Sequence, residues 1–367
     1  MLKILDKFLY PIVFVCLLVR KIKSIVIKPK EKDQISVGLL KLSAFGDVLK
    51  IADVLTNLEL ENKKYKFDLI TTKKSNPEFF SSAPVFTSVI ILNPLQLLIF
   101  AAKNLFTDQY DVIIDLDQYY LISGCIASSN LRSGAFHSKA KNIYAASIFK
   151  YNEYGSEYDN FRGLICMVLG ICKQEKSDEL LPVKFSCESK LNLDHHGQNL
   201  IILYPGSSEN AIYRRWPLSN YVELAKLLLP NYCVRFVGGP DELGICQKLD
   251  VNGLSEINLI NQLSLIELTV LFRDSVSLFV GNDAGLLHLA DSQRVPCFGI
   301  YGPNLFEKWG GVTTGSKGFW SNTKCRPCIK NGAGQIPKYC KFGEPVCVTR
   351  VTVAEVAKKI KEHMEKI

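Results

Sequence analysis

Short apolar runs alternate with segments of helical periodicity from residue 35 onward. In the first half, strands are predicted at residues 35–41, 67–72, 88–92 and 112–116, with helices at 47–60 and 95–106. In the second half, strands are predicted at 200–204, 233–237, 257–260, 276–280 and 296–301, with helices at 218–229, 241–249, 265–273 and 284–293. This alternation indicates an α/β protein whose parallel sheets are joined by right-handed crossovers.

The two α/β series are separated by residues 172–198, which are polar and poorly periodic, as is typical of a linker. The chain has 367 residues, enough for two domains of about 150–200 residues each. We therefore expect an N-terminal arm at 1–34, a first domain at 35–180, a second domain at 199–350 and a closing helix at 351–367.

The N-terminal arm carries an uninterrupted apolar run at residues 8–19. As a helix this run would be about 18 Å long, too short to cross a hydrocarbon core of about 30 Å. It ends in Arg20, Lys21 and Lys23 rather than in the small residues of a signal-peptide cleavage site. We predict an interfacial anchor whose cations meet anionic headgroups. The alternative is a helix docked on the first domain.

The net charge of +8 is concentrated at the two ends of the chain. Residues 1–34 carry +5 and residues 324–367 carry +6, which leaves −3 for the rest. A nucleic-acid-binding protein places its basic excess on the folded body, so no nucleic acid partner is expected. Twelve irregularly spaced cysteines do not resemble a secreted disulfide scaffold. We expect a cytoplasmic protein, peripherally associated with the inner face of the cytoplasmic membrane.

Two common phosphate-binding motifs are absent from the sequence. Neither half opens with G-x-G-x-x-G and no G-x-x-x-x-G-K-[ST] occurs, which argues against a dinucleotide-dependent dehydrogenase and a P-loop enzyme. Ligand sites are then expected at the carboxyl ends of the strands of both domains, facing each other across a cleft.

The first loop at a strand end is KLSAFGDV, residues 41–48, which places Asp47 at a helix start. A carboxylate held there can act as a general base. Aspartate is also a favoured N-cap residue, and position alone favours the cap over the base.

The loop after strand 200–204 brings Ser207 and Ser208 together with Arg214 and Arg215, just before a helix. Hydroxyls and paired guanidinium groups suit a diphosphate. The next residue, Trp216, is interpreted as a packing residue rather than a ligand contact.

Two further loops complete the candidate donor site. GGPDE at 238–242 places Glu242 where an acid could hold a ribose diol, or simply favour a helix N-terminus. In GNDAGLLHLA at 281–290, a strand gives way to a helix whose free amides would attract phosphate oxygens. His288 lies one turn into that helix and shares the loop with Asp283.

In their order, these motifs resemble glycosyltransferase family 9, the lipopolysaccharide heptosyltransferases. That family has signature blocks similar to KLSAFGDVLK, YPGSS…RRWP, GGPDE and GNDAGLLHLA…VPCFGIYGP, and to YDVIIDLDQYYLISG…LRSGAF at 110–136. The resemblance spans about residues 35–360. It implies the GT-B fold, with two Rossmann-like domains facing a central cleft, the acceptor bound by the first and the nucleotide sugar by the second.

The resemblance also implies roles for individual residues. Asp47 matches the catalytic base. The donor-binding positions match Ser207 and Ser208 at the diphosphate, Arg214 two residues before the tryptophan, Glu242 at the ribose, and Asp283, Ala284, Gly285 and His288 around the donor sugar and phosphates. Where this chain has Ala284 the family often has Thr, so one hydroxyl is missing here.

The implied reaction is an inverting displacement in which Asp47 takes the proton of an acceptor hydroxyl. The donor would be ADP-heptose and the acceptor a lipopolysaccharide core or related glycolipid. Hydroxyls, Arg214 and helix amides would stabilise the leaving group, so no metal and no cofactor are expected. Two alternatives are a nucleotide-sugar epimerase of the same fold and a non-catalytic nucleotide-sugar-binding protein at the membrane. The second of these would not need Asp47.

Four cysteines near the C-terminal end, Cys325, Cys328, Cys340 and Cys347, could offer thiolates to zinc. The first pair has the spacing of a zinc site, but the following gap is wide for a zinc ribbon. A structural zinc ion therefore stays an open alternative.

Overall fold

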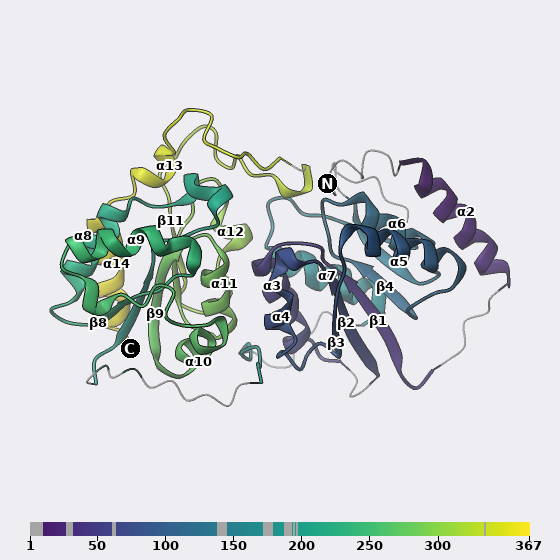
Figure 1. Ribbon diagram of the computed structural model, residues 1–367, viewed down its shortest axis with the longest axis horizontal. Helices are drawn as coiled ribbons and strands as arrows, with labels where there is room; N and C mark the ends of the chain where they lie inside the picture. The colour runs from purple at the N-terminus through teal and green to yellow at the C-terminus, as the bar shows by residue number, and fades with distance from the viewer. Residues whose placement is uncertain are drawn as a thin grey trace. The chain divides into compact units, whose positions relative to one another are not determined.

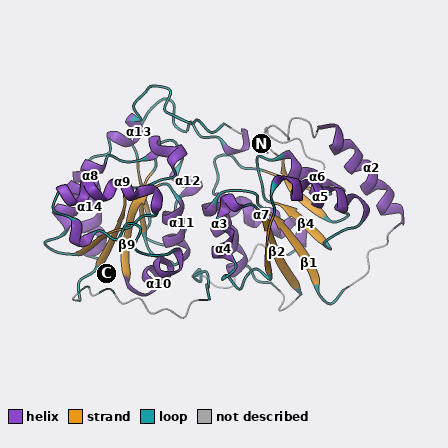
Figure 2. Ribbon diagram, viewed as in Figure 1, coloured by secondary structure: helices purple, strands orange, loops and turns teal. Residues whose placement is uncertain are grey.

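The computed structural model describes residues 10–26, 32–60, 64–137, 145–171, 179–186, 193, 195, 197–333 and 335–367, leaving aside the side chains of 10–14 and 333. The chain divides into two compact α/β units (Figures 1 and 2). Unit 1 is Met1–Ser186 with Lys330–Gln335, and unit 2 is Cys187–Ile329 with Ile336–Ile367. Most of the predicted linker at 172–198 lies outside the described residues.

Unit 1 is built on a six-stranded parallel sheet of order β3-β2-β1-β4-β5-β6. Its strands are β1 (Ile35–Leu40), β2 (Tyr65–Thr71), β3 (Ser88–Ile91), β4 (Val112–Asp115), β5 (Ser133–His137) and β6 (Ser147–Lys150). Its helices are α2 (Tyr10–Val26), α3 (Phe45–Asn57), α4 (Pro77–Phe80), α5 (Pro94–Phe106), α6 (Leu121–Ser129) and α7 (Glu157–Leu169). Because helices cover both faces of such a sheet, strands such as β1 and β4 are almost wholly apolar and buried.

Unit 2 is built on a five-stranded parallel sheet of order β11-β10-β9-β7-β8. Its strands are β7 (Leu200–Tyr204), β8 (Cys233–Phe236), β9 (Val276–Asn282), β10 (Cys297–Ile300) and β11 (Lys317–Phe319). Its helices are α8 (Leu218–Leu228), α9 (Leu243–Val251), α10 (Leu265–Ser275), α11 (Gly285–Ser292), α12 (Phe306–Trp309), α13 (Val346–Thr349) and α14 (Val353–Met364). The last of these lies within the range predicted for a closing helix and packs on α8.

The strand predicted at 257–260 is wrong. Ser255–Ile257 form a 3-10 turn, η5, and the pairing with β8 is reduced to a single bridge between Phe236 and Asn258. The Asn258 side chain accepts a hydrogen bond from the Ile260 N–H at 3.0 Å. Such local side-chain bonds offer the backbone an alternative to a strand ladder.

Helix α2 is docked on unit 1, against α6 and α5 (Figure 1). The side chain of Lys23 is buried and its ammonium donates to the carbonyls of Asn104 at 2.6 Å and Ser129 at 3.3 Å, and to Asp108 Oδ1 at 2.7 Å. The face of α2 that carries Lys23 is therefore docked on unit 1, as the alternative to an interfacial anchor predicted. The prediction that Lys23 meets lipid headgroups is wrong. Among the helices described, none combines the length and apolarity that spanning a bilayer requires.

Candidate functional site

The loop between β1 and α3 places Asp47 in the first turn of α3. The residue at the N-cap position is Ala44, with a φ of 77°, and no side chain caps the helix. The carboxylate of Asp47 turns instead to Lys41, whose Nζ lies 2.6 Å from Asp47 Oδ2. The N-cap interpretation of Asp47 is therefore wrong, and a left-handed φ at Ala44 is the kind of backbone strain that collects at functional loops.

The Lys41–Asp47 ion pair is buried, with side-chain exposures of 0% and 7%. The ammonium of Lys41 also donates to Gln118 Oε1 at 2.6 Å. Gln118 in turn donates to the carboxylate of Glu157, whose other oxygen accepts from the Tyr151 hydroxyl at 2.7 Å. A continuous hydrogen-bond network of this kind fixes the position of each member, so Lys41 holds the Asp47 carboxylate in one place.

A second carboxylate, Asp117, shapes the loop that carries this pair. Its Oδ2 accepts from the Leu42 N–H at 3.1 Å, while Oδ1 accepts from the N–H groups of Tyr119 at 2.8 Å and Tyr120 at 3.0 Å. Asp117 thus ties the segment after β4 to the segment after β1.

The burial of Asp47 changes its acidity. Removal from water raises the pKa of Asp47 to about 6, because the opposing effect of the Lys41 ammonium does not fully offset burial and the nearby charge of Glu157. For Lys41 the balance is different: burial lowers its pKa, but the carboxylates of Asp47 and Asp117 more than compensate, so its pKa is raised. A carboxylate whose pKa is near 6 is well matched to proton abstraction near neutral pH.

The sequence did not reveal the partners of Asp47. Lys41 and Asp117 lie inside the motifs quoted above. A lysine directly after the apolar strand β1 and an acid shortly after the apolar strand β4 were visible signals. Gln118 lies beside Asp117, but nothing in the sequence marks Glu157, because its link to Gln118 joins residues 39 apart in the chain.

In unit 2, four loops meet at the carboxyl edge of the sheet. Asn282 ends β9, and Asp283 follows it. The loops after β7, β8 and β10 bring in the other polar groups of this edge, namely Ser207, Ser208, Arg214, Arg215, Glu242 and Asn304. Apart from Arg215, Asn282 and Asn304, these belong to the predicted donor-binding set.

Asp283 is the centre of one group of side chains at this edge. Arg214 NH1 lies 3.7 Å from Asp283 Oδ2 and His288 Nε2 lies 3.8 Å from Asp283 Oδ1. Asn304 donates a hydrogen bond to Oδ2 of the same carboxylate. The buried Nε of Arg214 has no hydrogen-bond partner among the described residues. This guanidinium group therefore keeps a buried N–H available for an anion.

Ser207 belongs to a second group, in which its hydroxyl is already engaged. It donates to the Ala211 carbonyl at 3.0 Å and accepts from Arg215 Nε at 3.1 Å. Arg215 NH2 also lies 3.6 Å from Glu242 Oε1. Ser208, by contrast, is exposed. Both serine hydroxyls were predicted to bind the diphosphate. Ser208 is exposed to solvent, whereas the Ser207 hydroxyl is already hydrogen-bonded to Arg215.

Glu242 is buried beneath the loop after β7. Its carboxylate accepts from the Gly239 N–H at 2.9 Å, and burial raises the pKa of Glu242. A Cβ at Gly206 would lie 2.3 Å from Glu242 Oε1, so any larger residue there would displace the Glu242 side chain from its observed position. The contact with a ribose that the resemblance implies for Glu242 stays a prediction.

Asn282, missed from the sequence, joins three parts of the site. Its Oδ1 accepts from the Trp216 N–H at 2.9 Å and from the Tyr221 hydroxyl at 3.0 Å, and its Nδ2 donates to the Gly206 carbonyl at 2.9 Å. Trp216 is 1% exposed and its Nε1 donates to the Val351 carbonyl at 2.8 Å, which confirms its interpretation as a packing residue.

We expect Asn282→Ala to lower the free energy of unfolding by about 2–4 kcal/mol, because it leaves the buried Gly206 carbonyl and Trp216 N–H without partners. Urea denaturation of the two proteins measures the difference. The control is Asn252→Ala, which removes an exposed amide bonded to the Lys248 carbonyl and should change stability by under about 1 kcal/mol. Equal effects of the two substitutions would contradict the role of Asn282.

Helix α11 begins at the same edge, with Ala284 as its N-cap residue and no side-chain cap. A threonine or serine at this position would usually accept a hydrogen bond from a first-turn amide. The Leu287 N–H already donates to the Ala284 carbonyl at 3.1 Å. The amides before it have no side-chain cap, and a phosphate oxygen is an acceptor that helix N-termini favour.

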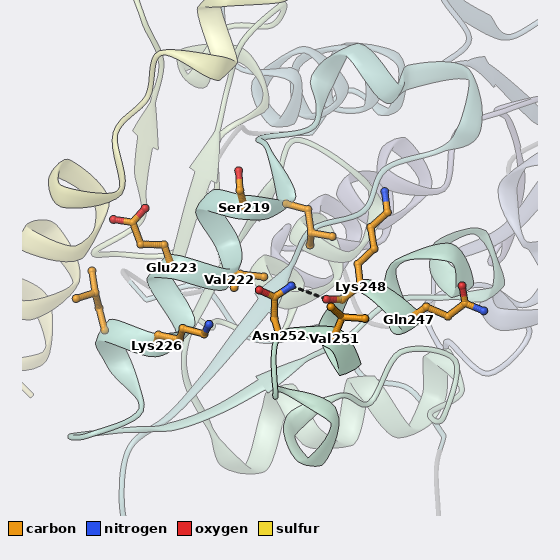
Figure 3. Close-up of a pocket in the computed structure, with 10 residues that line it drawn as sticks. Ser219, Val222, Glu223, Lys226, Gln247, Lys248, Val251 and Asn252 are labelled. Carbon is orange, nitrogen blue, oxygen red and sulfur yellow. Dashed lines mark hydrogen bonds between the residues drawn. The ribbon is translucent and has the colours of Figure 1, made fainter.

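A groove of about 940 Å³ lies elsewhere in unit 2, between α8 and α9 (Figure 3). Its lining includes Val222, Glu223, Lys226, Lys248 and Val251. None of the predicted donor-binding residues lines this groove. We therefore do not assign the donor to it.

The four C-terminal cysteines line one hollow in unit 2. Burial raises the pKa of the Cys347 thiol to about 11 and also raises the pKa of Cys328. Across the described residues, no group of three or more histidine, cysteine or acidic side chains is arranged to hold a metal ion.

Comparisons with known proteins agree on one family. The profile of glycosyltransferase family 9 (heptosyltransferase) matches residues 100–336. Lipopolysaccharide heptosyltransferase 1 from Campylobacter coli is 26% identical over 301 residues, covering 72% of this chain and 83% of that protein. The structure of E. coli ADP-heptose lipopolysaccharide heptosyltransferase II aligns with a TM-score of 0.66 at 15% identity, over 90% of this chain and 99% of that one.

A third likeness is to TibC, described as an iron-containing dodecameric glycosyltransferase from enterotoxigenic E. coli. It aligns with a TM-score of 0.57 at 15% identity, over 92% of this chain and 78% of that one. At such identities these structures bear on the fold alone. Together with the two parallel sheets, they confirm the predicted GT-B fold of two Rossmann-like domains.

Proposed function

The chain belongs to glycosyltransferase family 9, the heptosyltransferases, and from this we propose that it transfers heptose from ADP-heptose to a lipopolysaccharide core or related glycolipid, with inversion at the anomeric carbon. Family membership favours sugar transfer over the alternatives of an epimerase and a non-catalytic binding protein. The relatives' names include lipopolysaccharide heptosyltransferase and ADP-heptose heptosyltransferase, which supports this donor and this acceptor class.

The observation that carries the proposal is the anion-binding character of the edge around Asp283. The buried Nε–H of Arg214 has no hydrogen-bond partner in the part of the chain that the structure describes, and the first turn of α11 has no side-chain cap. Together they offer donors to the diphosphate of a nucleotide sugar, and the exposed Ser208 hydroxyl can add a third. Such preorganised donors stabilise the negative charge that develops on the departing diphosphate.

In unit 1, Asp47 is the proposed general base. It takes the proton from the acceptor hydroxyl, and that oxygen attacks the anomeric carbon on the face opposite the nucleotide, so that the C–O bond to the diphosphate breaks. Lys41 fixes the carboxylate that receives the proton and keeps its pKa from rising further. Lys41 is a positioning residue in this proposal.

We propose that transfer does not depend on a metal ion, because Arg214 and the amides of α11 supply the positive charge that a metal would otherwise provide. TibC is described as iron-containing, so this part needs its own test. Activity that survives exhaustive treatment with a chelator supports it, and activity lost with the chelator and restored by iron overturns it.

The acceptor and the arm together suggest a location. A glycolipid acceptor lies in a membrane, and the basic, apolar arm at 1–34 suits an anionic surface. We propose peripheral association with the inner face of the cytoplasmic membrane.

A donor screen tests the proposed function. Purified protein is titrated with ADP-heptose and with UDP- and GDP-sugars by calorimetry, and the binders are then tested for transfer to truncated lipopolysaccharide. Binding and transfer with ADP-heptose are expected. Failure of every nucleotide sugar to bind would contradict the proposed function. Conversion of the sugar without any acceptor would indicate an epimerase.

We expect Arg214→Gln to weaken ADP-heptose binding by about 10- to 100-fold, because a charged hydrogen-bond donor to a phosphate is worth roughly 1.5–3 kcal/mol. The same calorimetry measures the loss. The control is Arg273→Gln, which removes an exposed arginine paired with Asp274 and should leave the donor Kd unchanged. An unchanged Kd in Arg214→Gln would remove Arg214 from the donor site.

A further inference from the structure

Helix α2 exposes an apolar face although it is docked on unit 1. Val15, Leu18, Ile22 and Ile25 are 50%, 61%, 53% and 78% exposed. Their spacing of three, four and three residues places them on one side of a helix. The opposite side carries the buried Cys16.

Helix α5 has a matching exposed stripe. Leu95, Ile99 and Phe106 are 65%, 47% and 81% exposed, and Ala102 between them is exposed too. Both helices pack on α6, which is buried along its whole length, and they also contact each other (Figure 1). We call these eight residues of the outer helix layer the α2–α5 face. Exposed apolar areas of this kind mark interaction surfaces.

The charged side chains that α2 and α5 themselves carry are all basic. Neither α2 nor α5 contains an aspartate or glutamate. Lys21 and Lys103 are exposed, and Arg20 is partly exposed. Beside α2, a hollow of about 420 Å³ is lined by Leu17, Arg20, Lys21, Ser24 and Leu131. Arg20 and Lys21 make the lining of this hollow basic, which suits the phosphate of a lipid headgroup.

The way α2 is docked limits how it could meet a membrane. Like the other described helices, α2 is not long and apolar enough to span a bilayer. The buried ammonium of Lys23 holds it to α5, to α6 and to Asp108 just after α5 through three hydrogen bonds. The helix can therefore lie along a surface without leaving the domain. An apolar face beside basic residues is the pattern of an interfacial helix.

We propose that the α2–α5 face docks unit 1 on an anionic lipid bilayer. The face enters the headgroup region with its apolar side chains, and Arg20, Lys21 and Lys103 contact the lipid phosphates. The inference deepens the proposed function and rests on it, since a glycolipid acceptor places the enzyme's substrate in that surface. It differs from a free N-terminal anchor because the surface is shared with α5, far along the chain.

Vesicle flotation of the full chain tests the proposal, with phosphatidylcholine vesicles that contain or lack phosphatidylglycerol. The double variant Leu18→Glu with Phe106→Glu changes one residue of each helix. The control is Leu227→Glu with Val251→Glu, two residues of unit 2 that are 53% and 88% exposed. We expect binding only to phosphatidylglycerol vesicles, weakened about tenfold or more in the double variant and by added salt, and unchanged in the control.

Other results overturn the proposal. Membrane docking is contradicted if the wild-type chain floats with neither kind of vesicle. It is also contradicted if the double variant floats as well as the wild type. A wild-type dimer that the double variant converts to a monomer assigns the α2–α5 face to a second copy of this chain. Calorimetry with ADP-heptose and transfer to a delipidated, water-soluble acceptor are run on the same variants. They separate failure of the docking proposal from failure of the proposed function, because those assays need no bilayer.

Discussion

Replacing Asp47 by Asn is expected to lower kcat by about 10²- to 10⁴-fold, the usual contribution of a general base. The amide has nearly the same shape as the carboxylate but cannot take the proton from the acceptor hydroxyl. Because the donor groups lie in unit 2, the Kd for ADP-heptose should stay unchanged. Single-turnover transfer to truncated lipopolysaccharide, together with calorimetry for the donor, measures both quantities.

A second aspartate of α3 supplies the control for this experiment. Asp53 is buried and accepts from Asn57 Nδ2 at 2.9 Å. Asp53→Asn therefore makes the same chemical change in the same helix, and its kcat should stay within about threefold of the wild type. Transfer by Asp47→Asn at a rate close to that of Asp53→Asn would show that Asp47 is not the base.

The pH dependence of the unmodified enzyme follows from the same group. With the pKa of Asp47 at about 6, the carboxylate is available above that pH and protonated below it. The value of kcat/KM is therefore expected to be level above about pH 7 and to fall tenfold per unit well below pH 6, since kcat/KM reports the free enzyme. Steady-state rates between pH 4.5 and 8.5 measure the profile. A profile level down to pH 5 would contradict the assignment.

The fold could be predicted wherever the local pattern of apolar and polar residues is compatible with only one secondary structure. Strand β7 occurs at Leu200–Tyr204, as predicted. A short apolar run that begins after a polar residue and ends at Pro205-Gly206 is typical of a strand in a sheet covered on both faces. The strand at 257–260 failed because a local bond from the Asn258 side chain outweighs a short apolar signal. Helix α6 was not predicted, since a helix buried on every side has no amphipathic period to read.

In the candidate site, residues that belong to one short motif could be predicted, whereas contacts between residues far apart in the chain could not. The positions of Asp283 and His288 could be predicted because one short motif fixes the strand, the turn and the first helical turn together. The network behind Asp47 could not, because Lys41 and Gln118 are 77 residues apart and meet only through the pairing of β1 with β4. Nor could the sequence show that the hydroxyl of Ser207 is already bonded to Arg215.

Replacing Lys41 by Met is expected to shift the acid limb of the kcat/KM profile upward by about 1–3 pH units, the range over which a close opposite charge lowers a carboxyl pKa. Burial and the charges of Glu157 and Asp117 already raise the pKa of Asp47, and Lys41 opposes them. Without the ammonium, the carboxylate would be protonated at higher pH, and activity at pH 7 would fall by about 2- to 100-fold. Raising the pH to 9 should restore much of it.

The same substitution is also expected to lower the free energy of unfolding by about 3–5 kcal/mol at pH 7, because it leaves a buried carboxylate without its cation. That loss should shrink at pH 5, where protonation of Asp47 removes the buried charge. The control is Lys50→Met, which removes a buried lysine of α3 that is not among the main groups acting on the Asp47 pKa. It should leave the acid limb in place whatever its effect on stability. A Lys41→Met enzyme with an unmoved acid limb would show that Lys41 supports the fold without tuning the base.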